Sequence, residues 1–228
     1  MGGKYRFYSF IFIIMSATWH LINAQYVIPS KMSWWYEARF GMFIHFGSYS
    51  YLGRGEWAFS VENWSKADYQ EQVSARFNPT SFNAGDIVRL IKDAGMKYLV
   101  ITAKHHEGFC MWKTSVESFR DVTGTKIYSL QGFTNFSSRD VLQELKDSCE
   151  AQGIKFCLYY SILDWCHPSQ TIFHGDNWYT YSVMDSDTAR KDYIRDMKLQ
   201  LKELITRYHP AVLWFDGDWT YNAGLPET

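Results

Sequence analysis

The chain has 228 residues, and its 23 Lys or Arg residues nearly balance 24 Asp or Glu residues, which gives a formal net charge of -1. This balance argues against the basic surfaces that bind nucleic acids or anionic membranes. Because 46% of the residues are hydrophobic and 21% are charged, the composition predicts a globular protein with a large core and excludes a mainly disordered chain.

Residues 1–24 have the pattern of a secretory signal peptide. Two basic residues precede an apolar run at 8–19, and Asn23-Ala24 supplies small residues for cleavage before Gln25. A transmembrane anchor is the alternative, but an anchor needs about 20 apolar residues and this run is shorter. We therefore predict export to the extracellular space, the periplasm or the lysosome, and a mature chain, 25–228, that has no membrane segment.

Export permits disulfide bonds, and the chain has four cysteines, Cys110, Cys149, Cys157 and Cys166. None of them stands in a C-x-x-C pair, so their spacing argues against a zinc site built on thiolates. We expect buried thiols or at most one disulfide bond, and the sequence leaves the pairing open.

Short apolar segments alternate with helical patterns along the mature chain. The segments predicted to be strands buried on both faces are 41–46, 98–103, 154–160 and 211–215. Helices are predicted over about 83–95, from Ser137 or Ser138 to Gly153, and over 187–208. This alternation predicts right-handed crossovers and a parallel sheet.

Polar residues collect where the predicted strands end. These residues are His45, Lys104-His105-His106, Tyr159 with Ser161, and Asp216. A (β/α)8 barrel builds its active site at this end of its strands, so a barrel is the expected fold. A doubly wound open sheet is the alternative, but no Gly-rich phosphate loop follows the first strand.

A closed barrel needs eight strands and only four are predicted. We therefore expect 25–228 to hold about the first four strand-helix units of a partial catalytic barrel, as a fragment or a short product. Its open sheet edges would favour poor solubility or self-association into a homo-oligomer.

Five motifs resemble a known enzyme family. They are WWYEARFGMFIHFG at 34–47, GEW at 55–57, KHHEGF at 104–109, LYYS at 158–161 and LWFDGDW at 213–219. In this order and spacing they look like the α-L-fucosidases of glycoside hydrolase family 29. The resemblance runs from about Trp34 to Trp219.

The resemblance implies a retaining exo-glycosidase that hydrolyses terminal α-L-fucosyl residues of fucosylated oligosaccharides or glycoproteins, without a cofactor. In complete members a small β-sandwich follows the barrel, and we expect residues 25–228 to hold no such domain. The Asp of WFDG is the family's nucleophile, which makes Asp216 the catalytic residue here, and Trp214 shares its strand face. The family's acid/base Glu follows the nucleophile, beyond Thr228, so we expect the short chain to be inactive.

The resemblance also implies a set of sugar-binding residues. They are His45, Glu56, Trp57, His105, His106, Tyr159 and Trp214. The imidazoles can each donate to and accept from a hydroxyl, and the aromatic faces can pack against the C5-methyl side of fucose. For Glu56, a supporting acidic role and a role in orienting neighbouring loops are equally compatible with the sequence.

Two other functions fit parts of the pattern. A divalent metal held by the histidines, Glu107 and Asp216 would explain the histidine cluster, but it leaves WFDG and GEW unexplained. A fucose-binding homologue without catalysis would fit the lack of an acid/base residue. The linkage of the fucosyl residue is left open.

Overall fold

The computed structural model describes residues 28–136, 138–174 and 180–217, and the chain divides into two units, 1–39 and 40–228. In the first unit a 3-10 turn, η1 (Ser30–Met32), leads into α2 (Ser33–Ala38), which ends at Arg39 in a left-handed conformation. The predicted signal peptide, 1–24, lies outside the described residues. None of the described helices is long and apolar enough to cross a membrane.

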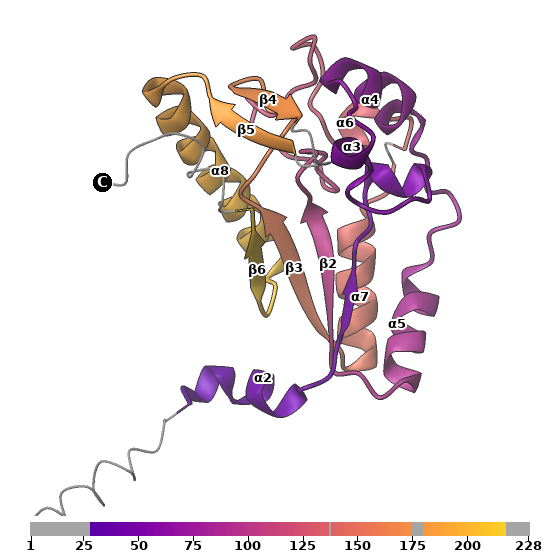
Figure 1. Ribbon diagram of the computed structural model, residues 1–228. Coiled ribbons are helices and arrows are strands. Elements are labelled where there is room, and N and C mark those ends of the chain that lie inside the picture. Colours follow the sequence, from indigo (N-terminus) through magenta and orange to yellow (C-terminus); the bar gives the residue numbers. More distant parts are fainter. Residues whose placement is uncertain (1–27, 137, 175–179, 218–228) are drawn as a thin grey trace, which may run out of the picture. The chain divides into compact units, whose positions relative to one another are not determined.

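The second unit is built on a parallel four-stranded sheet (Figure 1). Its strands, in the order β1-β2-β3-β6, are β1 (Met42–Ile44), β2 (Tyr98–Lys104), β3 (Lys155–Ser161) and β6 (Leu213–Asp216). All four predicted strands and their parallel pairing are confirmed. The fold is therefore of the α/β class.

Three longer helices connect these strands. They are α5 (Ala84–Asp93), α7 (Val141–Gln152) and α8 (Asp187–Tyr208). Helix α7 contacts α5, α8 and β3, while α5 also contacts β2 (Figure 1). The helix predicted over 187–208 has the predicted bounds. The shorter helices are η2 (Ser48–Tyr51), α3 (Ala58–Val61), α4 (Lys66–Gln72), η3 (Ser74–Arg76) and α6 (Leu130–Phe133).

The helix ends follow from local hydrogen bonding. Asn83 caps α5, since its side chain accepts a hydrogen bond from the Asp86 amide. The start predicted for α7 at Ser137 or Ser138 is wrong. Asp140 is the cap, because its carboxylate accepts from the amide of Gln143, and the helix begins one residue later.

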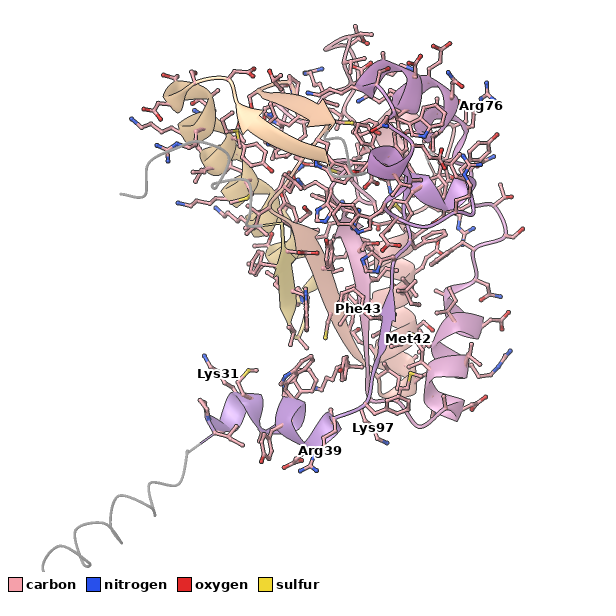
Figure 2. The ribbon with its side chains drawn as sticks, viewed as in Figure 1. Lys31, Arg39, Met42, Phe43, Arg76 and Lys97 are labelled. Carbon is pink, nitrogen blue, oxygen red and sulfur yellow. The ribbon has the colours of Figure 1, made fainter. Side chains whose placement is uncertain are left out.

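The two faces of the sheet differ in what covers them. Alternate strand residues such as Leu99, Ile101 and Leu158 join the helices in one hydrophobic core. Met42 and Phe43, labelled in Figure 2, are consecutive and so lie on opposite faces of β1. Phe43 is 38% exposed and Trp214 is 45% exposed, so the face without helices presents aromatic side chains.

An antiparallel hairpin that the sequence did not predict joins β3 to α8. It consists of β4 (Gln170–His174) and β5 (Thr180–Met184), and it lies near the end of the sheet where the parallel strands finish (Figure 1).

The four cysteines are buried free thiols, as predicted.

The turn after β2 requires a glycine. Gly108 has a φ of 80°, and a Cβ at this position would lie 2.1 Å from the Oδ1 atom of buried Asp164. Gly124 has a similar φ of 69°, but a Cβ there would meet no atom within 4 Å. Substitutions at these two positions therefore distinguish the cost of backbone strain, which both share, from the cost of a steric clash, which only Gly108 has.

We expect Gly124→Ala to lower the free energy of unfolding by about 1–2 kcal/mol, the usual cost of a left-handed conformation. Gly108→Ala should cost a further 1–3 kcal/mol or so, because it also forces the packing apart around Asp164. Urea unfolding of both variants measures the difference. Equal losses would show that the close approach of Gly108 to Asp164 does not matter.

Candidate active site

The predicted site residues lie together at the end of the sheet that is formed by the carboxyl ends of the four parallel strands. Tyr159 is paired with Trp214, and Ser161 is paired with Asp216, in the register of β3 and β6. His105 and His106 directly follow β2, and His45 follows β1. Residues from four separate stretches of the chain thus meet here.

Asp216 is held by donors on both oxygens. The Tyr159 hydroxyl donates to its Oδ2 atom at 2.8 Å, and the Gly217 amide donates to its Oδ1 atom at 2.7 Å. The Nε2 atom of His106 lies 3.8 Å from Oδ2. The side chain is 34% exposed, so Asp216 combines a defined orientation with access from solvent.

Tyr159 keeps its proton for this hydrogen bond. Burial raises the pKa of its hydroxyl far above the usual range, and the hydrogen bond to Asp216 and the charge of Asp216 raise it further. Tyr159 is therefore a donor at every physiological pH.

Three histidine rings pack together beside Tyr159. The ring centroids of His105 and His106 are 4.1 Å apart, and the ring of His45 is 5.2 Å from that of His105. The ring of His105 also stacks on Tyr159 at 5.7 Å. Thr102 supports this group, because its hydroxyl bonds both the amide and the carbonyl of Phe46, next to His45.

Burial keeps His105 and His106 neutral. It lowers the pKa of His105 to about 3, with further lowering by His45, although Glu56 and Asp216 act in the opposite direction. Burial and the neighbouring His105 lower the pKa of His106 well below its usual range, against the pull of Asp216. Each ring therefore has one donor and one acceptor nitrogen at neutral pH.

The predicted tryptophans contribute at two places. The ring of Trp57 lies 5.2 Å from that of His106, so the GEW segment reaches the histidine cluster. Trp214 packs edge-on against Phe43 at 5.5 Å and remains partly exposed. Trp57 thus borders the histidines, whereas Trp214 lies on the aromatic sheet face.

Four further residues support the site. The sequence placed Lys104 and Ser161 at strand ends and offered Glu107 as a possible metal ligand, but it gave none of them a supporting role and did not indicate Asp164. Lys104 forms a buried ion pair with Asp164 at 2.9 Å, and Ser161 lies 2.7 Å from the Nδ1 atom of His106. Glu107 is 1% exposed, with its Oε2 atom 3.4 Å from the Nδ1 atom of His105. The sequence offered one signal for Lys104, which is its place directly after an apolar strand. A lysine buried there requires a partner.

Among the described residues, no group of three or more His, Cys, Asp or Glu side chains has an arrangement that could hold a metal ion.

The neutral state of His105 makes the stability of the chain depend on pH. Because the pKa of His105 is about 3 in the folded chain against an ordinary 6.5, its contribution is fully present above pH 6.5. It is lost as the pH falls from 6.5 towards 3, since the unfolded chain then binds a proton that the folded chain does not.

From pH 7 to pH 5, the free energy of unfolding of the native chain should fall by about 2 kcal/mol more than that of His105→Asn. Urea unfolding of both proteins at the two pH values gives this difference. The same pH dependence in both proteins would show that His105 is not buried in its neutral form.

Comparison with known proteins identifies the family of the chain. The family model described as alpha-L-fucosidase matches residues 16–225. The tissue alpha-L-fucosidase of Rattus norvegicus is 31% identical over 82% of this chain and 39% of its own length. The chain thus spans about two fifths of the length of the curated relatives it matches.

Solved structures of fucosidases are similar over most of the chain. The alpha-L-fucosidase isoenzyme 1 of Paenibacillus thiaminolyticus has a TM-score of 0.66 and 35% identity, over 82% of this chain and 42% of that one. A family 29 enzyme of Bacteroides thetaiotaomicron, solved as a covalent intermediate trapped with 2-fluoro-fucosyl fluoride, has a TM-score of 0.69 and 29% identity, over 87% and 44% of the two chains. With a family match that covers nearly its whole length, this chain belongs to the alpha-L-fucosidase family.

Proposed function

We propose that this chain carries the nucleophile and part of the sugar pocket of a retaining α-L-fucosidase, with Asp216 as the nucleophile. The observation that supports this role is the setting of Asp216, whose two oxygens are oriented by Tyr159 and Gly217 while the side chain stays open to solvent. A nucleophile must be fixed in direction and reachable by the sugar.

In the proposed reaction, an Asp216 oxygen attacks the anomeric carbon of a terminal α-L-fucoside as the bond to the leaving oxygen breaks. The electron pair of that bond goes to the leaving oxygen, which takes a proton from a general acid. Water then hydrolyses the fucosyl-enzyme ester and restores Asp216. The hydrogen bond from Tyr159 keeps the Asp216 carboxylate in one orientation before attack and after release.

Glu107 is not suited to protonate the leaving group. Burial raises its pKa to about 8, so it holds a proton at neutral pH. It is only 1% exposed, however, and its carboxyl group contacts Ser48 and lies beside His105. We assign Glu107 to bracing the histidine cluster and Glu56 to a supporting acidic role, and we place the acid/base outside the described residues.

The remaining predicted residues form the proposed sugar pocket. The rings of His45, His105 and His106 offer nitrogen atoms to hydroxyl groups. Trp57, Tyr159 and Trp214 offer aromatic faces to the apolar side of fucose. The partly exposed ring of Trp214 supports this assignment, because it shares a strand face with Asp216. The proposed substrates are fucosylated oligosaccharides or glycoproteins.

We further propose that the parallel sheet is part of a (β/α)8 barrel and that residues 1–24 direct export. The barrel is supported by helices packed on one face of the sheet and by partly exposed aromatic residues on the other, which is the arrangement of a barrel wall. An open doubly wound sheet would have helices on both faces.

Labelling with 2-deoxy-2-fluoro-fucosyl fluoride tests the nucleophile without the acid, because fluoride leaves without being protonated. We expect mass spectrometry to find one fluorofucosyl group per chain, on the peptide that contains Asp216. Asp216→Asn should not be labelled, whereas Asp140→Asn, which changes a hydrogen-bonded helix-cap aspartate, should be labelled as the native chain is. Label on another carboxyl group would overturn the assignment of Asp216.

The histidines are tested by binding. We expect His105→Ala to weaken the binding of fucose by about 2- to 13-fold, which corresponds to the loss of one neutral hydrogen bond of about 0.5–1.5 kcal/mol. Isothermal titration gives the dissociation constant, and thermal unfolding of the same sample shows whether the variant is folded. Unchanged fucose binding by a destabilised variant would mean that His105 is only a core residue.

A further inference from the structure

The hydroxyl group of Ser161 lies between two partners that constrain its single proton. Its Oγ atom is 2.7 Å from the carbonyl oxygen of Leu163 and 2.7 Å from the Nδ1 atom of His106. Ser161 is fully buried, so no bulk water competes for these positions.

The direction of both hydrogen bonds follows from counting protons. A carbonyl oxygen can only accept, so the Ser161 hydroxyl donates its proton to Leu163. The Oγ atom then has only lone pairs to offer to His106. The short contact to Nδ1 is therefore a hydrogen bond only if the imidazole carries its proton on Nδ1 and donates it to Ser161.

The surrounding backbone holds this arrangement in place. The Trp165 amide donates to the carbonyl of His106 at 2.7 Å, and the Ile162 amide donates to the carbonyl of Asp216 at 2.7 Å. The ring of His106 is also packed against Trp57 and Trp165, with centroids 5.2 Å away in each case. The ring therefore has little freedom to turn and exchange its two nitrogens.

We propose that Ser161 is a positioning residue that fixes His106 in its Nδ1–H tautomer, so that Nε2 presents a lone pair beside the nucleophile. With Nδ1 protonated and the ring neutral, Nε2 is an acceptor that lies 3.8 Å from the acceptor Oδ2 of Asp216.

The ligand group that fits this position is a hydroxyl that donates its proton to His106. This step rests on the proposed function, because it takes a sugar hydroxyl as the donor. His106 therefore distinguishes a hydrogen-bond donor from a group that cannot donate. A hydroxyl binds at Nε2, and a fluorine of similar size, which cannot donate, binds more weakly. The specificity for that hydroxyl then originates in Ser161, which the sugar does not have to touch.

The tautomer is measured first, by two-bond proton-nitrogen NMR of the histidine rings in the whole chain at neutral pH. We expect His106 to be protonated on Nδ1 in the native chain and to gain the Nε2–H form in Ser161→Ala. Ser161→Thr, which keeps the hydroxyl, should retain the native tautomer. Ser74→Ala is the matched control, since it removes a buried hydroxyl that bonds Tyr128 and leaves the Ser161 bonds intact.

The proposal is overturned if native His106 is protonated on Nε2, or if Ser161→Ala leaves the tautomer unchanged. The native spectrum alone decides the first point, even if Ser161→Ala does not fold.

Binding of L-fucose and its ring-deoxyfluoro analogues then tests the consequence. At one ring position, we expect the change from hydroxyl to fluorine to weaken binding to the native chain by about 2- to 13-fold, the value of one neutral hydrogen bond. Ser161→Ala should bind fucose more weakly and should lose most of that discrimination. The same discrimination in both proteins would contradict the role of Ser161 in recognition. If the native tautomer is as expected but fucose does not bind, the proposed function is wrong, and the positioning of His106 by Ser161 remains supported.

Discussion

The ion pair between Lys104 and Asp164 is the interaction on which the geometry of this site depends. Both side chains are essentially inaccessible to solvent, at 0% and 2% exposed, where an unpaired charge would cost several kcal/mol. Burial alone would lower the pKa of Lys104, but the negative charge of Asp164 and the nearby tyrosines outweigh it and raise the pKa well above the usual range. The lysine is therefore a permanent cation beneath the site.

This cation ties together three parts of the chain. Its ammonium group lies over the ring of Tyr160 on β3 at 4.7 Å and lies 3.4 Å from the hydroxyl of Tyr193 on α8. A register shift in β2 between Thr102 and Lys104 makes this possible. Thr102 bonds the β1 end, Lys104 turns to the helix side, and the next two residues are the buried histidines.

Sequence reasoning succeeded where the information is local. The alternation of side chains along a strand placed Trp214 and Asp216 on one face, and helix periodicity gave the bounds of α8. The end of the first strand likewise placed His45 beside the other histidines. Such patterns need only the geometry of one strand or one helix.

The supporting contacts were not predictable in the same way. Asp164 is 60 residues from Lys104, and Ser161 is 55 residues from His106. The first contact depends on how the loop after β3 folds, and the second depends on the pairing of β3 with β2. The start of α7 was misplaced because three residues that commonly cap helices, the two serines and Asp140, stand close together. Only the hydrogen bond to the Gln143 amide distinguishes the cap.

The four buried thiols give the fold a set of internal probes. Burial raises the pKa of Cys149 and of Cys157 to about 12, and it raises the pKa of Cys110 and of Cys166 as well, so the thiols are protonated and unreactive in the folded chain. They lie in α7, in β3 and in the loops that follow β2 and β3. An alkylating reagent reaches each thiol only when that part of the chain opens. The rate of modification at each cysteine therefore reports how often the helix, strand or loop that holds it separates from the rest of the fold.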